Sequence, residues 1–211
     1  MTTSEVTKGT LELYGTGTVD AVPDVANLRL SIVTERKTAG EAVSGNAKDA
    51  SAVLQQILGL GIPREDIQTE GLNLFPIYQT DPSTNVTSLI AYRASNTLSI
   101  AAPVDLAGKV FDVGVAAGVD ESSGLSFGMR DPRPLREKAL ELAVSAARKE
   151  AELVCRAMGV TLLGPKSIQV QSGSGPLRFE SARLFDKAQT PVMPGSLSIS
   201  ATLQVVFEYS V

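Results

Sequence analysis

The chain has 211 residues, of which 43% are hydrophobic and 20% charged, a composition typical of an ordered globular protein. Its formal net charge of −4 argues against a nucleic-acid surface, which needs clustered lysine and arginine. One cysteine, Cys155, excludes a disulfide framework and a multi-cysteine zinc site. No stretch reaches the length of an apolar membrane span, so no integral membrane segment is expected.

Two strand patterns open the chain. Residues 10–17 alternate weakly, and residues 25–34 place four apolar side chains on one face: Ala26, Leu28, Leu30 and Ile32. We expect two adjacent strands. Gly15-Thr16-Gly17 does not predict a nucleotide-binding loop, because no third glycine follows and the next segment has a strand pattern.

The first helix pattern begins after Thr38. Thr38 and Glu41 have the spacing of a capping box, and apolar residues then recur at helical spacing up to Leu58. Gly59 and Gly61 are expected to end this helix.

The middle of the chain predicts a long hairpin followed by a shorter helix. Residues 67–78 and 89–100 have strand patterns, and the polar tip between them, residues 79–88, should be exposed and mobile. Asp105 is placed to cap the helix, which should end at Gly118. The residues expected to be buried on it are Leu106, Val110, Val113 and Ala117.

Asp131 is expected to cap the third and longest helix, with Pro132 at its first position and Gly159 at its end. Arg148 lies one turn before Glu152, which predicts an ion pair. The start of this helix mixes both charges and is interpreted as a solvated surface: Arg130, Arg133, Arg136 and Lys138 beside Asp131, Glu137 and Glu141.

The rest of the chain completes an α+β fold. Strand patterns cover residues 123–129 and 167–171, and residues 197–209 alternate apolar and polar side chains. The sheet should be mostly antiparallel, with the three main helices packed on one face. The short connections between elements predict one sheet and a single domain over residues 1–211.

Residues that carry chemistry are scarce. The absence of histidine removes Ser-His and Cys-His nucleophilic systems and the commonest general base, and no phosphate-binding Gly-Lys-Ser or Gly-Lys-Thr occurs. The nearest carboxylate pairs lie beside turns, where such residues commonly bond the local backbone: Asp20 with Asp24, and Asp120 with Glu121. Cys155 is interpreted as a buried small hydrophobic residue. No catalytic residue, metal ligand or cofactor is predicted.

Residues 172–195 form the most distinctive segment, because irregular loops of this length inside compact domains are usually functional or disordered. Apolar and basic side chains alternate in it, a composition suited to covering a protein surface. The loop either packs on its own domain or contacts a neighbouring subunit. The candidate contact residues are Leu177, Arg178, Phe179, Arg183, Phe185 and Met193.

Several short segments follow a familiar order: Gly15-Thr16-Gly17, Val22-Pro23-Asp24, Gly61-Ile62, Ile67-Gln68-Thr69, Pro76-Ile77-Tyr78, Ala91-Tyr92-Arg93-Ala94, the alanine-rich third helix, Met158-Gly159 and residues 191–195. With them the chain resembles the SIMPL domain family, the YggE-like proteins of bacteria. The resemblance implies an α+β fold with helices on antiparallel sheet. It also implies a role like that of other members, which look like exported or periplasmic proteins linked to stress defence, and some of which form large homo-oligomers. A eukaryotic relative acts as a signalling adaptor. The family offers no accepted catalytic residues.

Three functions follow as hypotheses. The first is a non-enzymatic, self-associating protein whose subunits meet at a sheet edge and at residues 172–195. The second is a module that binds a small molecule or a partner protein, using the face exposed by the hairpin tip, residues 79–88, and the loop of residues 172–195. The third is a carboxylate-dependent enzyme. As written, the N-terminus lacks the apolar core of a signal peptide, which predicts a cytoplasmic protein, or a periplasmic one if a leader has been removed.

Overall fold

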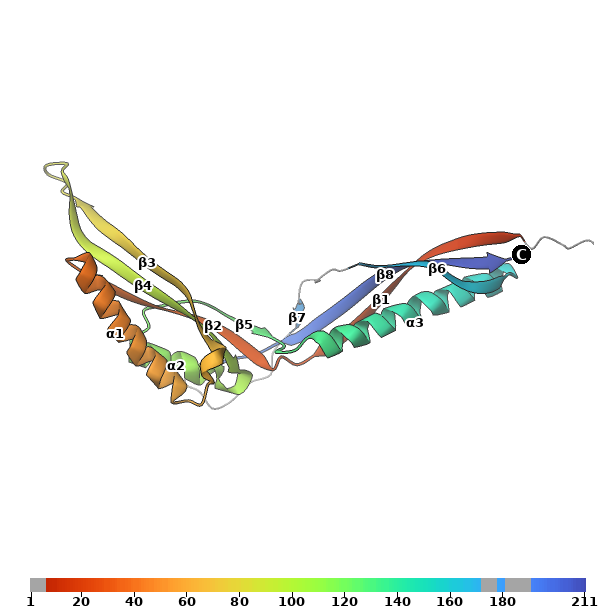
Figure 1. The fold of residues 1–211 in the computed structure, drawn as a ribbon, viewed down its shortest axis with the longest axis horizontal. Coiled ribbons are helices and arrows are strands. Elements are labelled where there is room, and N and C mark those ends of the chain that lie inside the picture. The colour runs from red at the N-terminus through yellow and green to blue at the C-terminus, as the bar shows by residue number, and fades with distance from the viewer. Residues whose placement is uncertain (1–6, 172–177, 181–190) are drawn as a thin grey trace, which may run out of the picture. The chain divides into compact units, whose positions relative to one another are not determined.

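The computed structural model describes residues 7–171, 178–180 and 191–211. Three α-helices lie in this part of the chain, namely α1 (Ala39–Leu58), α2 (Ala107–Ala117) and α3 (Arg133–Met158), together with two antiparallel four-stranded sheets (Figure 1). The predicted α+β class, antiparallel pairing and three main helices are confirmed. None of the described helices is long and apolar enough to cross a membrane.

One sheet, which we call the terminal sheet, contains both ends of the described chain. It consists of β1 (Lys8–Ala21), β6 (Thr161–Gln171), β7 (Arg178–Glu180) and β8 (Ser196–Ser210). The strand order is β1-β8-β6, and β7 also pairs with β8. The alternation that predicted β8 is confirmed, because Leu203, Val205 and Phe207 are buried on one face, beneath α3.

The contact between α3 and the terminal sheet is unusually close. The helix faces the sheet with a row of small residues, Ala139, Ala143, Ala147, Ala151 and Cys155, all buried. A Cβ atom added at Gly15 would lie 2.1 Å from the backbone oxygen of Ala143, and one added at Gly17 would lie 2.1 Å from that of Ala139. Gly15 and Gly17 therefore allow the helix backbone to approach β1, which explains the glycine pair that the sequence left without a role.

The second sheet, the central sheet, consists of β2 (Val25–Arg36), β3 (Ile67–Thr80), β4 (Thr87–Pro103) and β5 (Glu121–Gly128), in the order β3-β4-β2-β5. α1 and α2 pack on it over a core that includes the four apolar residues predicted on β2. Asn46 of α1 is buried in this layer and donates from Nδ2 to the backbone oxygens of Ile32 (2.8 Å) and Ala94 (3.3 Å). The long hairpin of β3 and β4 is confirmed.

The prediction of one sheet is wrong. β1 pairs along its whole length with β8, from Lys8 opposite Ser210 to Ala21 opposite Leu197, whereas β2 lies between β4 and β5. β1 and β2 are consecutive in the chain but are not neighbours in a sheet. Alternation shows that a segment is a strand without showing which strand it pairs with. The described residues divide into two compact units, one around each sheet, and the single-domain prediction stays a prediction.

The helix ends agree with the sequence in most places. The Thr38 side chain accepts from the backbone nitrogen of Glu41, which confirms Thr38 as the N-cap, and the Glu41 carboxylate accepts from the Thr38 hydroxyl instead of from its backbone nitrogen. Gly61, Gly118 and Gly159 have φ of 84°, 111° and 70°, a left-handed conformation that glycine adopts without strain.

Two predicted caps need correction. Asp105 lies in a 3₁₀ turn, Val104–Leu106, and makes no capping bond, because α2 begins at Ala107 and the amide of that residue bonds the backbone oxygen of Val104 instead. Leu106, Val113 and Ala117 are only half-buried, and Val110 alone of the predicted set is fully buried. At α3 the cap position is Pro132, although Asp131 Oδ1 still accepts from the backbone nitrogen of Arg133 at 3.1 Å.

Candidate functional site

The predicted contact loop is only partly within the described residues. Leu177, Arg183 and Phe185 lie outside them. Arg178 and Phe179 belong to β7, opposite Ser198 and Leu197 of β8. Met193 is exposed, while its neighbour Val192 packs against the core of the central sheet. Part of the loop thus packs on its own chain, and the role of the six residues in subunit contacts stays a prediction.

The carboxylates near turns mainly bond their surroundings. Asp24 Oδ1 accepts from the backbone nitrogen of Arg130 at 2.7 Å, and Asp120 Oδ2 accepts from that of Val33 at 2.8 Å. Asp20 Oδ1 accepts from the Ser198 hydroxyl at 2.5 Å. Within the described ranges no group of three or more Cys, Asp or Glu is arranged to hold a metal ion. These side chains serve local structure.

Two arginines near the start of α3 form separate ion pairs. Arg130 binds Asp66 with two hydrogen bonds, of 2.8 and 2.9 Å, and this bonding lowers the pKa of the Asp66 carboxyl. Arg133 pairs with Asp131 at 2.7 Å, which lowers the pKa of Asp131 in turn. The mixed-charge interpretation is therefore confirmed for Arg133 and Asp131, but the sequence showed no sign that Arg130 would bind a residue 64 positions away.

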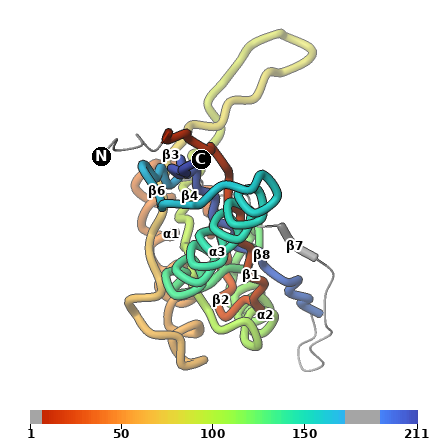
Figure 2. The backbone as a smooth tube through the Cα atoms, turned by 90° about the vertical axis from the view of Figure 1, so that its right-hand side faces the viewer, coloured from red at the N-terminus to blue at the C-terminus, as the bar shows by residue number. Residues whose placement is uncertain are grey.

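The outer part of the β3–β4 hairpin exposes an apolar surface, which we call the hairpin surface. Its members are 42–70% exposed: Leu72, Leu74, Phe75, Tyr78, Leu89 and Ile90. Leu74 lies opposite Ala94, whose side is buried toward α1, whereas Phe75 lies opposite Arg93 on the other face. The hairpin runs on past the end of α1 (Figures 1 and 2). Within the described part of the central unit, large apolar side chains are therefore exposed on both faces of the hairpin.

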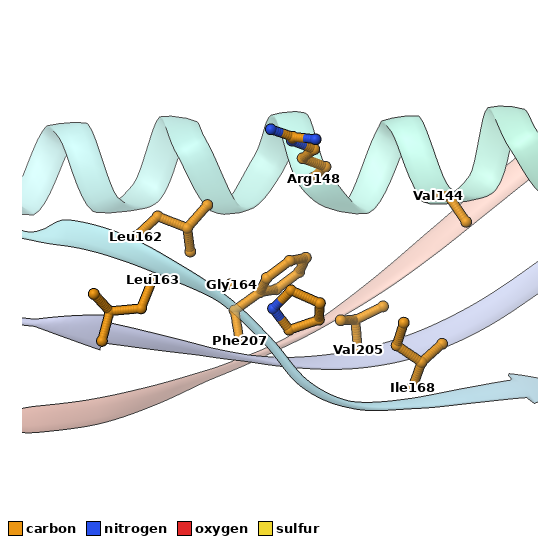
Figure 3. A pocket seen from close by; sticks show the side chains of 9 residues that line it. Val144, Arg148, Leu162, Leu163, Gly164, Ile168, Val205 and Phe207 are labelled. Atoms are coloured by element: carbon orange, nitrogen blue, oxygen red, sulfur yellow. The ribbon is translucent and has the colours of Figure 1, made fainter.

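A groove runs between α3 and β6 on the terminal sheet (Figure 3). It encloses about 330 Å³, and its floor is formed by the buried residues Val205 and Phe207. Ile168 lies opposite Val205 in the sheet and so shares the helix-facing side, yet it is 54% exposed. The reason is that α3 packs chiefly over β1 and β8 and leaves this side of β6 open.

The groove continues along the flank of α3. A hollow there is lined by Glu137, Leu140, Glu141, Val144, Ser145 and Arg148, and it shares Val144 and Arg148 with the groove. The predicted ion pair between Arg148 and Glu152 is present at 3.0 Å, on the exposed side of the helix. The edge strand β6 has two bulges around Gly164 and Pro165, which disfavour the pairing of a further strand.

Both surfaces are suited to binding rather than to proton transfer. The groove is lined by apolar side chains and one arginine, and the hairpin surface is apolar on both faces. The sequence predicted binding at the face exposed by the hairpin tip, but it did not identify the exposed side chains of β3 and β4 or the groove, because an exposed leucine and a buried one look the same in an alternating strand. An excess of apolar residues toward a hairpin tip was the one available signal.

Comparison with known proteins agrees with the resemblance found in the sequence. The model of the SIMPL family, described as a protein of unknown function (DUF541), matches residues 11–207.

A 26 kDa periplasmic immunogenic protein of Brucella melitensis is 30% identical over 211 residues, which cover 94% of this chain and 84% of that protein. The uncharacterized protein YggE of Edwardsiella ictaluri is 30% identical over 152 residues, covering 72% of this chain and 63% of that one. For YggE of Escherichia coli K12 the identity is 29% over 140 residues, with 65% and 56% covered. None of these names is that of an enzyme. With a family match over most of its length, the chain belongs to the SIMPL family of proteins of unknown function.

Proposed function

We propose that this protein is non-enzymatic and works by self-association, with the hairpin surface as its principal contact. The observation that carries the proposal is the group of six large apolar side chains, 42–70% exposed, on a hairpin whose outer part runs past the end of α1 (Figure 1). Monomeric proteins rarely expose large contiguous apolar patches, and larger ones mark interaction sites.

Strand geometry favours contact through side chains rather than a continuous added strand. β3 is an edge strand, and an edge presents unpaired backbone groups to a neighbour. Register shifts at Thr69/Gly71 and Ile77/Tyr78, together with Pro76, interrupt that edge. A second hairpin would then pack its leucines and aromatic rings against this one, so that one apolar face of each hairpin is buried in the contact.

Light scattering coupled to size exclusion tests this proposal. The wild-type protein should elute well above the 22.1 kDa of one chain, and Leu72→Asp with Phe75→Asp should shift it toward the monomer. Val115→Asp is the matched control, because Val115 is 49% exposed on α2 and lies outside the hairpin surface. A 22 kDa species at millimolar wild-type concentration would sink the proposal.

A place in the cell envelope belongs to the same proposal. The Brucella relative is named periplasmic, which supports a periplasmic location, and a link to stress defence follows the family resemblance. Fractionation of cells that carry the complete gene tests the location. Survival of a deletion strain under oxidant, compared with the complemented strain, tests the role.

A module that binds a partner protein is the second candidate. The groove between α3 and β6 favours it, since about 330 Å³ lies at the lower end of the range for ligand pockets. With one arginine as its sole charged lining residue, the groove lacks the convergent polar groups that orient a small molecule. Native pull-down with wild-type protein and an Ile168→Asp variant would separate this candidate from self-association. A heterologous partner lost in the variant supports it, and recovery of the same chain alone counts against it.

A carboxylate-dependent enzyme has the least support. It requires paired, buried carboxyl groups with raised pKa. Among the described residues, the carboxyl groups with a shifted pKa are those of Asp66, Asp81 and Asp131, and hydrogen bonds lower the pKa of each.

A further inference from the structure

β1 forms one edge of the terminal sheet. It pairs with β8 on one side, and no strand among the described residues pairs with it on the other. The amide of Val211 donates to the backbone oxygen of Thr7 at 3.1 Å, and hydrogen-bonded pairs alternate along antiparallel strands. The odd-numbered residues of β1 therefore bond β8, while the even-numbered residues point their backbone N–H and C=O groups toward the open edge.

β1 differs from the other edge strands of the described sheets because nothing interrupts it. β3 and β6 each have two register shifts and a proline, the pairing of β5 shifts between Arg29 and Leu30, and β7 has only three residues. Such features protect natural edges from further pairing. β1 keeps one register with β8 over all its 14 residues, contains no proline, and has its one lysine at its first position. A strand could be added along it without obstruction.

α3 overhangs this open edge with apolar side chains. The helix backbone lies directly over β1, as the 2.1 Å distances at Gly15 and Gly17 show. Leu142 is about 200° around the helix from Val144 of the groove, and its Cβ atom would lie 2.7 Å from a Cβ atom at Gly17. Leu153 follows about three turns later on the same flank. These two leucines are 44% and 60% exposed, and helix-facing side chains of an added strand would contact them.

Steric limits and charge decide what can occupy the edge. Neighbouring strands lie about 4.8 Å apart, whereas packed helix axes lie about 8–10 Å apart. Two copies that paired β1 antiparallel around a twofold axis would place both α3 helices on one face, closer than this limit allows. The occupant is therefore an extended segment with no helix of its own above it. On the face away from α3, β1 exposes the carboxylates Glu12 and Asp20, which favour basic residues in that segment.

We propose that the open edge of β1 binds an extended segment of a partner protein as an added antiparallel strand. The segment has apolar residues at alternate positions, in contact with Leu142 and Leu153, and basic or hydroxyl residues between them, beside Glu12 and Asp20. In this mode backbone hydrogen bonds give affinity, and alternate side chains give specificity. The edge is separate from the hairpin surface and from the groove, so the inference does not rest on the proposed self-association.

Hydrogen exchange of single amides, measured by NMR, tests the edge directly. The probe is a seven-residue peptide in which valines alternate with lysines and threonines. Without peptide, the amides of Thr10, Tyr14 and Thr16 should exchange faster than those of their odd-numbered neighbours, and saturating peptide should slow them by about tenfold or more. If these amides are already slow in the peptide-free monomer, the chain itself covers the edge and the proposal is overturned. Slowing that follows protein concentration instead overturns it in favour of a second copy.

Two N-methylated forms of the peptide are matched probes of the backbone bonds. In an antiparallel pair the residues on the face away from α3 bond β1, so methyl groups on the lysine and threonine amides should abolish binding. Methyl groups on the valine amides, which point away from β1, should leave affinity within about threefold. Fluorescence anisotropy of labelled peptide measures the affinity. Equal binding of the two forms, or no saturable binding of the unmodified peptide, overturns the proposal.

Side-chain variants test the overhang and the charges. Leu153→Asn removes an apolar contact and should weaken peptide binding about tenfold. Val115→Asn is the control, because it makes a similar change at an exposed position of α2, and circular dichroism confirms that each variant is folded. Glu12→Lys should weaken binding of the lysine peptide and strengthen that of a counterpart with glutamates in place of lysines. A Leu153→Asn variant that binds as tightly as Val115→Asn contradicts the proposed site.

Discussion

Replacing Gly17 with alanine should destabilise the terminal unit, although alanine is normally the better residue in a strand. The added methyl group would lie 2.1 Å from the backbone oxygen of Ala139 and 2.6 Å from the backbone nitrogen of Ala143. These are backbone atoms of a helix, so no side-chain rotation relieves the clash. α3 must move away from β1 by more than 1 Å to reach ordinary contact at 3.4 Å or beyond.

Two effects of opposite sign set the magnitude. Removing a glycine from a strand contributes about 0.5–1 kcal/mol of stability. Overpacking of a well-packed interface costs about 1–3 kcal/mol and occasionally more, and here the upper end applies because the alanine row along α3 must separate from the sheet. The net effect should be a loss of about 2 kcal/mol, or roughly 4–8 °C in Tm for a chain of this size.

Hydrogen exchange measured by mass spectrometry, together with urea denaturation, checks this prediction. Amides of α3 should exchange faster in Gly17→Ala, while those of α1 should keep the wild-type rate. Gly40→Ala is the control, because a Cβ atom at this position of α1 meets nothing within 4 Å, and it should stabilise the chain by up to about 1 kcal/mol. A Gly17→Ala variant as stable as the wild type would refute the close approach of α3 to β1.

Two further predictions concern the central unit. Asn46→Ala removes the buried donor to the backbone oxygens of Ile32 and Ala94, and it should lower the free energy of unfolding, measured by urea denaturation, by about 1–3 kcal/mol. The control is Asn73→Ala, at an exposed position of β3, which should change that free energy by less than about 0.5 kcal/mol. Equal effects of the two substitutions would contradict the buried bond. Because Arg130 lowers the pKa of Asp66 from its ordinary 3.8, the ion pair stabilises the fold above that pH and is lost as pH falls through the folded pKa. The difference in unfolding free energy between the wild type and Asp66→Asn should therefore be constant from pH 7 to about pH 5 and become smaller below pH 3.8. A difference that grows on acidification would contradict the ion pair.

Much of the local structure was predictable from the chain. The N-cap at Thr38 and its contact with Glu41 depend on two side chains three residues apart, and the Arg148–Glu152 pair depends on one helical turn, so each could be predicted from spacing. The buried face of β2 and the glycine ends of the helices follow from periodicity and φ preferences in the same way. Asp105 failed as a cap because a 3₁₀ turn before α2 supplies the backbone bond instead, and a competing backbone bond leaves no mark in the residue pattern.

The candidate surfaces were less predictable. Of the six contact residues named from the sequence, Met193 is the one whose side chain lies within the described residues, and it is exposed. The hairpin surface was interpreted as ordinary alternation, since the pattern of Leu72 to Tyr78 does not say where α1 ends above it. The groove beside α3 depends on how far the helix extends across β6, which no local pattern encodes.

By itself, the sequence determined the three main helices, most of the strands, their order and the absence of histidine chemistry, because these depend on residues within one or two turns of each other or on composition. It did not predict the short strand β7 inside residues 172–195 or the start of β6 at Thr161. Only the tertiary structure decided that β1 pairs with β8 instead of β2, that Arg130 binds Asp66, and that Gly15 and Gly17 admit the backbone of α3. Those contacts join segments far apart in the chain, and their choice depends on the free energy of all competing pairings together. The surfaces proposed for function are what that choice leaves uncovered.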